Sequence, residues 1–328
     1  MIARLDLRAI DDLREALPQL PEIPLAHLQH VSSEQRRAYW LDEIRQSLTK
    51  ESAIALSSIV AGTINGFILY SDSPWDRQIT GRHIGAVEHL AVTSDDQAAA
   101  GILDELIDAL ARSVTDRGTE CLVCKVHSNA WPKIHALERH GFLLMDTLVD
   151  FVFDFSRTSL EKISLPERDP ELKIRRAAPQ DLPALMAINE KAFGAYFGRY
   201  HADRKMPTGA ATKIYAEWVR SALNGWADWI LVAEVNGTIA GYGLWRKPLE
   251  IEEKNSLRVA HYDLAAIDPE FRGRGLWTAL MLDGMRIARE FAQYIIGPVH
   301  VSNYRVQHSL QKFGWRISGA RHTLHKWL

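Results

Sequence analysis

The strongest constraint on the fold of this 328-residue chain is that its two halves repeat one order of elements. The run "EHLAVTSDDQAAAGILDELIDALARS", followed by "CLVCKVHSNAWPKIHALERHGF", parallels "DLAAIDPEFRGRGLWTALMLDGMRIARE" and the later "YIIGPVHVSNYRVQHSLQKFGW". Each copy predicts a strand, a turn, an amphipathic helix, a second strand and a helix ending at a glycine before an aromatic residue. Asn129 lies 12 positions before Gly141, and Asn303 lies 11 positions before Gly314. We therefore predict a tandem duplication of one domain.

The segments around the repeat indicate an α/β fold in each half. "WILVAEVNGTIAGYGLWR" predicts two strands joined at Asn-Gly, and "AIALSSIVAGTINGFILYSD" predicts a similar hairpin in the first half. The proline-marked "PQDLPALMAINEKAF" predicts the start of a helix. We expect a mixed central sheet with flanking helices in each half. Because the charged segment near "SRTSLEKISLPERDPELK" lacks periodicity, we predict domains over 1–157 and 173–328, joined by a linker over 158–172.

Composition argues against several classes of protein. The net charge is −2 and the pI about 6.7, so we expect no nucleic-acid partner. The sequence shows no signal peptide and no long apolar run, so we expect a cytoplasmic protein without membrane insertion. The cysteines, Cys121 and Cys124, fall in an apolar strand pattern that points their thiols to opposite faces. Since a structural zinc site needs two more ligands, we predict buried thiols and no metal.

The segment "AIDPEFRGRGLWTAL" predicts an anion-binding turn between a strand and a helix. Arg272, Gly273, Arg274 and Gly275 precede a helix that carries an apolar stripe. Amides at a helix start carry partial positive charge, and glycine lets a phosphate approach the backbone. The segment lacks the Gly-Lys-Ser/Thr of a nucleoside triphosphate loop and the third glycine of a dinucleotide fingerprint. We therefore expect a diphosphate ligand; a plain glycine-rich connection is the alternative.

This arrangement resembles the GNAT superfamily of acyl-CoA N-acyltransferases, whose signature Arg/Gln-x-x-Gly-x-Gly/Ala follows a Val-x-Pro strand end. Ile267, Pro269, Arg272 and Gly275 match that pattern, whereas Trp277 stands where glycine or alanine is usual. Its indole either narrows the phosphate approach or packs into the core. The resemblance implies acetyl-CoA or another short acyl-CoA as the donor. The residues predicted to bind it are Ala266, Ile267, Arg272, Gly273, Arg274, Gly275, Leu276, Trp277 and Asn303.

Two residues after the turn fit the same resemblance. In GNAT folds the central strands splay to admit the pantetheine arm, and Pro298, which cannot donate to a ladder, fits such a splaying or an ordinary strand edge. Asn303 ends the second strand, where it either contacts the cofactor arm or caps the next helix.

The first half matches the signature poorly. In "VTSDDQAAAGILDEL", Gln97 fits, but Ala100 and Ile102 take the glycine positions, and Asp95 and Asp96 would repel a diphosphate. We predict that the first half has lost CoA binding. The sequence does not show whether it binds another ligand.

Acyl transfer to an amine needs a neutral amine, a donor for the carbonyl oxygen and a proton for the leaving thiolate. The resemblance places the base on the strand before the turn, at Asp263, with His261 nearby, and Glu88 takes that place in the first half. The tyrosine that usually protonates the thiolate falls on Leu310, so Tyr304 becomes our candidate. A structural polar pair and a packing tyrosine are the alternative roles.

The region after the first helix of the second half is similar to bacterial sugar-amine N-acetyltransferases of the dTDP-fucosamine type, which pair a degenerate first half with an active second half. Their Arg-aromatic-x-x-Asp and Tyr-x-x-Trp-Ile runs match "RYHAD" and "YAEWV". The substrate-binding residues that we predict from this likeness are Arg199, Tyr200, His201, Asp203 and Arg204.

Other interpretations stay open. The acceptor could be another small amine, an amino-sugar conjugate or an aminoglycoside, and a non-catalytic acyl-CoA-binding protein is a further alternative. The sequence does not fix the acyl length, the acceptor, the residue that protonates the thiolate or the oligomeric state, for which a homodimer is one option.

Overall fold

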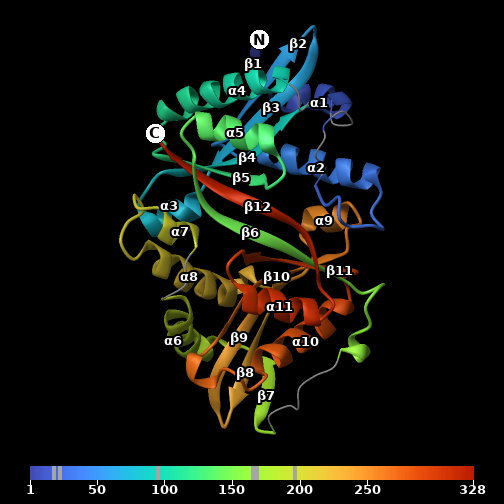
Figure 1. Ribbon diagram of the computed structural model, residues 1–328, viewed down its shortest axis with the longest axis vertical. Helices are drawn as coiled ribbons and strands as arrows, with labels where there is room; N and C mark the ends of the chain where they lie inside the picture. Colours follow the sequence, from blue (N-terminus) through green and yellow to red (C-terminus); the bar gives the residue numbers. More distant parts are fainter. Residues whose placement is uncertain (17–19, 21–23, 94–96, 164–169, 195–197) are drawn as a thin grey trace. The chain divides into compact units, whose positions relative to one another are not determined.

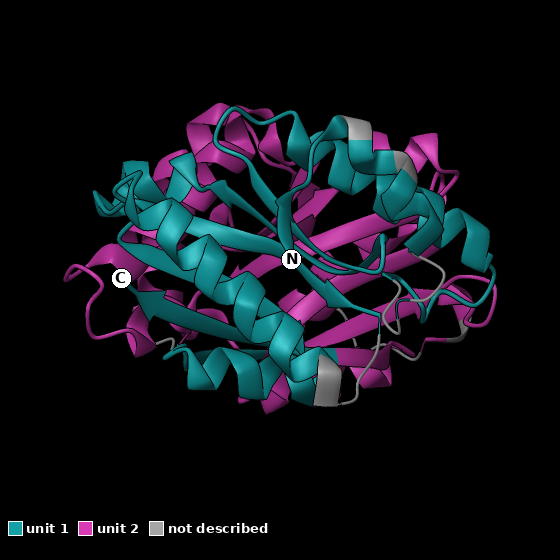
Figure 2. Ribbon diagram, turned by 90° about the horizontal axis from the view of Figure 1, so that it is seen from above, with its two compact units in different colours: residues 1–147, 320–328 teal, residues 148–319 magenta. Residues whose placement is uncertain are grey.

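The computed structural model describes residues 1–16, 20, 24–93, 97–163, 170–194 and 198–328, with elements labelled in Figure 1. The chain forms two compact units, coloured separately in Figure 2. The first contains Met1–Thr147 and Ala320–Leu328, and the second contains Leu148–Gly319.

The first unit is a mixed sheet with helices on both faces. Its strands follow the order β1-β2-β3-β4-β5-β12, in which β4 and β5 run parallel and the other neighbours antiparallel. The strands are β1 (Ile2–Arg4), β2 (Ile54–Val60), β3 (Thr63–Asp72), β4 (Ile84–Val92), β5 (Cys121–His127) and β12 (Arg316–Trp327). The helices are α1 (Ile10–Ala16), α2 (Ser33–Leu48), α3 (Pro74–Thr80), α4 (Gln97–Thr115) and α5 (Trp131–Arg139). One core lies against α4 and α5, and another against α1 and α2.

The second unit repeats this topology. Its strands follow the order β6-β11-β10-β9-β8-β7, with β10 and β11 parallel. The strands are β6 (Leu143–Asp154), β7 (Leu172–Arg176), β8 (Trp229–Val235), β9 (Thr238–Arg246), β10 (Val259–Ile267) and β11 (Tyr294–His300). The helices are α6 (Leu182–Phe193), α7 (Arg199–Ala202), α8 (Ala210–Ser221), α9 (Glu250–Lys254), α10 (Leu276–Arg289) and α11 (Tyr304–Lys312).

One strand of each unit follows the other repeat in sequence, and it belongs to that unit from Leu148 onward in β6 and from Ala320 onward in β12. Strand β6 closes the first half of the sequence but pairs with β11, where Val152 lies opposite Ile296. Strand β12 closes the chain but pairs with β5, where Leu324 lies opposite Cys124. The predicted linker, residues 158–172, falls within the second unit.

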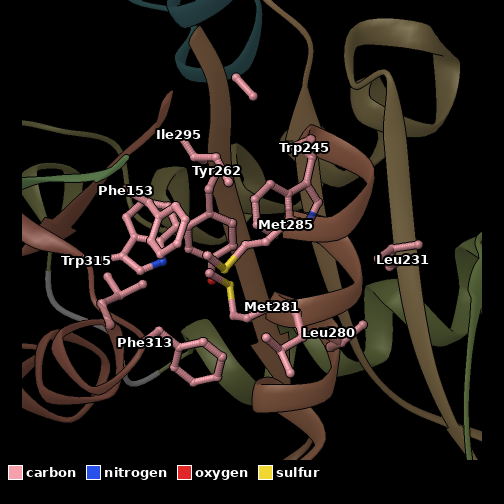
Figure 3. Packing of buried hydrophobic residues seen from close by; sticks show 14 of the residues in the cluster. Phe153, Leu231, Trp245, Tyr262, Leu280, Met281, Met285, Ile295, Phe313 and Trp315 are labelled. Atoms are coloured by element: carbon pink, nitrogen blue, oxygen red, sulfur yellow. The ribbon is translucent and has the colours of Figure 1, made fainter. Parts of the chain in front are cut away.

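The main core of the second unit lies between the sheet and α10. Figure 3 shows Trp245, Tyr262, Phe153 and Trp315 packed near methionines of α10. A smaller core on the opposite face contains residues of α6 and α8. The alternation of side chains along each strand places these two cores on opposite faces of the sheet.

Several local expectations are confirmed. Both hairpins form, with positive φ at Asn236 and Gly237 in the second half. Both cysteines are buried and unbridged, and burial raises the pKa of Cys124 to about 12. The α/β class with mixed sheets and flanking helices is confirmed. Among the described residues, no helix has both the length and the apolar character needed to cross a bilayer.

Candidate functional site

The centre of the second sheet opens where β10 and β11 separate. The two strands pair from Val259–Tyr294 to His261–Ile296, and each then continues beyond the last pair. At the point of separation Gly297 lies against the backbone of β10, because a Cβ there would come within 2.7 Å of the Tyr262 carbonyl oxygen. The expected splaying of the central strands is therefore present.

The glycine turn lies directly after β10. Gly273 and Gly275 have φ angles of 83° and 74°, in the left-handed region that glycine adopts without strain. The amide of Ala279 donates to the Gly275 carbonyl at 3.0 Å, at the start of α10. The backbone amides before Ala279 precede this bond and are not used within the helix. Arg272 and Arg274 are exposed beside them. The turn thus combines amide donors, a helix start and two cations, which suits a diphosphate.

Two acidic residues next to the turn share a lysine of α6. Lys191 Nζ lies 2.8 Å from Asp268 Oδ2 and 3.1 Å from Glu270 Oε1. Asp268 also accepts the Glu270 amide through its other oxygen. These bonds hold the start of the turn, and Lys191 offsets one of the two negative charges beside the predicted anion site.

Trp277 turns toward the core of its own unit. Its Nε1 donates to the Tyr262 hydroxyl at 3.2 Å, and its ring meets Phe313 edge-on with centroids 5.7 Å apart. Of the two roles considered for this indole, these contacts favour packing.

Asp263 sits on a β-bulge. Tyr262 pairs with Trp245 and Leu264 with Leu244, so Asp263 is an extra residue on β10. Bulges re-aim side chains and are frequent beside active sites.

The carboxylate of Asp263 is held by an arginine of β9. Its oxygens accept from Arg246 Nε and Nη2, each at 2.8 Å. Burial lowers the pKa of Arg246, but its bonds with Asp263 raise it further, so the net change is upward. The guanidinium lies 4.6 Å from the ring centroid of Trp226. Asp263 and Arg246 therefore form an ion pair next to an aromatic face.

His261 has a different carboxylate partner. Its Nε2 lies 2.8 Å from Oε2 of Glu252, a buried residue of α9. The same Glu252 oxygen accepts the Leu249 amide at 2.7 Å. His261 and Asp263 share a strand, but each is bonded to a separate group.

The remaining predicted residues of α11 take different positions. Tyr304 is 73% exposed at the helix start, so solvent reaches its side chain. Asn303 caps the helix by accepting the Val306 amide at 3.4 Å. Leu310 is fully buried in the main core. The capping role of Asn303 is thus present, and the position usual for tyrosine is filled by a packing residue.

The predicted acceptor residues gather on α7 and the turn after it. The Arg199 guanidinium stacks on the Tyr200 ring at 4.1 Å and donates to its hydroxyl. Burial lowers the pKa of His201. Asp203 is buried and accepts the amide two residues later, whereas Arg204 is exposed.

An aromatic series runs from α6 through α8 to the helical turn Ala222–Trp226. The rings of Phe193 and Tyr215 stack with centroids 4.5 Å apart, and Tyr215 stacks on Trp218 at 6.3 Å. Trp218 meets Trp226 edge-on at 5.9 Å. Arg246 contacts the Trp226 ring and also donates to Asp263, so it connects the aromatic series to β10.

The first unit carries a counterpart of the bulge. The β3–β4 register shifts at Glu88, the position that corresponds to Asp263. Glu88 accepts hydrogen bonds from Lys50 and Ser71. Burial raises its pKa, but the bonds from Lys50, Ser47 and Ser71 outweigh that effect and lower it. Asp95 and Asp96, invoked against a diphosphate here, lie outside the described residues.

A glycine turn beside a splayed strand pair defines the acyl-CoA N-acyltransferase type of architecture that the sequence resembles. Residues 186–315 match the model of the acetyltransferase (GNAT) family. The second half of the chain therefore contains a GNAT acetyltransferase domain.

Known proteins extend this likeness to the whole chain. The chain is similar to the spore coat polysaccharide biosynthesis protein SpsD of Bacillus subtilis, with 24% identity over 211 residues, covering 64% of this chain and 66% of SpsD. A tandem GNAT protein from the clavulanic acid biosynthesis pathway matches 100% of this chain and 98% of its own, with a TM-score of 0.61 and 11% identity. A glucosamine N-acetyltransferase region of a fungal GH3 β-N-acetylglucosaminidase matches 99% of this chain and 38% of its own, with a TM-score of 0.66 and 13% identity. The expected tandem GNAT fold is confirmed.

Sequence reasoning missed the partners of the two strand residues. Arg246 and Glu252 lie on neighbouring elements and hold Asp263 and His261, respectively. Arg246 ends the predicted hairpin strand and pairs with His261, so pairing the strands could have placed it near both candidates. The segment containing Glu252 carries several acidic residues, and nothing in its pattern singles out that one.

Proposed function

We propose that the second unit transfers an acetyl or other short acyl group from acyl-CoA to the primary amine of a small molecule. The observation that carries this proposal is the glycine turn before α10, which follows the end of β10 that has separated from β11. Amides there suit the diphosphate of CoA, and Lys191 offsets one of the two nearby negative charges. The GNAT match over residues 186–315 supports the same assignment.

The predicted roles follow from position. Residues 272–277 would hold the diphosphate, and the end of β10 that no longer pairs with β11 would face the pantetheine arm. His261 and Asp263 remain the candidates for handling the amine proton, and Tyr304 for protonating the thiolate. Asn303 is engaged as a helix cap, so its contact with the cofactor arm would use atoms other than the capping oxygen.

For the acceptor we propose the amino group of a nucleotide-linked sugar. Aromatic rings present flat apolar faces suited to sugar C–H groups, and Trp226 is 39% exposed next to Arg246. Arg199 and Arg204 supply cations suited to phosphate. The name of SpsD, a polysaccharide biosynthesis protein, and the glucosamine acetyltransferase title of the fungal region support this direction. Another small-molecule amine is the alternative acceptor.

Binding of acetyl-CoA tests the donor site. Gly275→Glu places a bulky carboxylate at a positive φ in the turn, so we expect binding by calorimetry to weaken at least a hundredfold. Ala100→Glu is the matched change in the first unit and should leave the affinity within twofold. Equal loss in both variants, or no binding by the wild type, would refute the site.

Thiol release from acetyl-CoA tests the acceptor. We expect turnover with dTDP-4-amino-4,6-dideoxygalactose and none with lysine peptides or aminoglycosides. Turnover with another amine alone would redirect the acceptor assignment. Tight acetyl-CoA binding without turnover on any amine would instead favour the non-catalytic alternative.

A further inference from the structure

We propose that Glu252 is a positioning residue that fixes the tautomer of His261, and that His261 rather than Asp263 takes the proton of the acceptor amine. This inference rests on the proposed acyl transfer. It divides the roles of two candidates that the sequence could not separate.

The imidazole of His261 is bonded to a buried carboxylate. Glu252 is 2% exposed, and its Oε2 lies 2.8 Å from His261 Nε2. The Leu249 amide donates to the same oxygen at 2.7 Å, which fixes the carboxylate against the start of α9. An ionised carboxylate only accepts hydrogen bonds, so the imidazole hydrogen lies on Nε2. Nδ1 then keeps the lone pair that a base requires.

The position of His261 carries the second step. His261 and Ile296 form the last pair between β10 and β11, so His261 stands at the point where the strands separate. The thioester of a pantetheine arm laid between the strands would end near this point. A side chain with a free lone pair there is placed to meet the incoming amine.

The engagement of Asp263 carries the third step. Both of its oxygens accept from the Arg246 fork at 2.8 Å. A carboxylate whose two oxygens are both engaged by one guanidinium fork is oriented toward that arginine and not toward an incoming amine. Asp263 therefore orients Arg246 over Trp226 and leaves proton transfer to His261.

Acyl transfer to the amine breaks the thioester bond and forms one amide bond. The neutral amine nitrogen forms a bond to the thioester carbonyl carbon, and the carbon–sulfur bond breaks. One amine proton passes to His261 Nδ1. The thiolate takes a proton from water or from a side-chain donor, and the imidazolium returns its proton to solvent. The products are the N-acyl amine and free CoA thiol.

Glu252→Ala tests the dyad. It removes the oxygen that accepts from both the Leu249 amide and His261 Nε2, so the ring hydrogen is no longer held on Nε2. We expect kcat to fall on the order of a hundredfold, with the KM for acetyl-CoA within twofold. Glu252→Gln is the conservative variant, because an amide oxygen at the same place can accept from both groups, and it should restore most of the lost kcat. Glu253→Gln, an exposed neighbour on α9, is the matched control and should keep wild-type kcat.

Two further readouts separate positioning from general damage. Nitrogen-15 NMR of the ring should show hydrogen on Nε2 in the wild type and in Glu252→Gln, and a mixture of both tautomers in Glu252→Ala. In a His261→Asn background, Glu252→Ala should lower kcat no further.

Each outcome bears on a separate conclusion. An unchanged tautomer or an unchanged kcat in Glu252→Ala, or a full additional loss in the His261→Asn background, would overturn the dyad. Failure of the proposed function is recognised separately, because the wild type would then neither bind acetyl-CoA nor release thiol, whatever tautomer NMR reports.

Discussion

Trp277 provides a test of whether the departure from the family signature blocks the donor site. Its indole donates to the hydroxyl of buried Tyr262 and packs edge-on against Phe313. If these contacts are its role, replacing it should weaken the fold and leave acetyl-CoA binding nearly unchanged.

The size of the effect can be worked from those contacts. Trp277→Phe keeps a ring against Phe313 but leaves the Tyr262 hydroxyl without its donor, which costs about 1–3 kcal/mol of unfolding free energy. Trp277→Ala also removes the ring. Removing a fully buried tryptophan ring costs about 3–5 kcal/mol of unfolding free energy, and about half of that cost applies to the half-buried Trp277 side chain. We therefore expect a total loss of about 3–5 kcal/mol for the alanine variant.

Denaturant unfolding and acetyl-CoA calorimetry on the same samples give both quantities. Tyr262→Phe is the control: combined with Trp277→Phe, it should cost less than the sum of the two single changes, because the hydrogen bond is lost once. Affinity for acetyl-CoA should stay within about threefold in every variant that remains folded. A tenfold or greater gain in affinity for Trp277→Ala would show that the indole plugs the site, and the packing argument would fail.

Two further predictions concern stability. A Cβ at Gly284 would lie 2.3 Å from the buried Trp245 ring, so Gly284→Ala should crowd the core. Alanine also favours the helix more than glycine does, and the net loss of unfolding free energy should be about 1–2 kcal/mol. Gly101→Ala in α4, with open space around it, should stabilise the protein by up to about 1 kcal/mol; thermal unfolding that ranks the pair oppositely would contradict this. Burial lowers the pKa of His89 from 6.5 to about 4, and its Nδ1 accepts from Trp40, so the unfolded chain binds more protons between those pH values. Stability should therefore fall by about 3 kcal/mol as pH drops from 6.5 to 4, and the stability of His89→Asn should change less over this range. Equal midpoints of urea unfolding for the wild type at pH 7, 6 and 5 would refute this.

Much of the fold can be predicted from the chemistry of residues that are close together in the sequence. The Asn236–Gly237 turn has the positive φ values that its residue types favour, and the glycines before α10 take the left-handed conformation that an anion turn needs. The repeat in the sequence reappears as two units whose strands follow one topology. These features depend on residues close together in the chain.

What the sequence could not supply depends on residues far apart. The bulge at Asp263 is a one-residue offset between two strands, and no pattern within β10 marks it. The pairing of His261 with Glu252 depends on how the short helix α9 packs against β10. The direction of the Trp277 indole is decided by Tyr262 and Phe313, one before it and one well after it in sequence.

Strand β6 comes from the first half of the sequence but pairs with β11, and β12 comes from the second half but pairs with β5. A cut at the predicted linker would therefore not separate the two halves into complete domains. A fragment starting at residue 158 would lack β6, and the backbone groups of β11 that now meet Leu148–Asp154 would face water as a bare sheet margin. The fragment ending at residue 157 would in turn lack the partner of β5. Neither piece would be a finished domain, so each half of the repeat depends on the other for the last strand of its sheet.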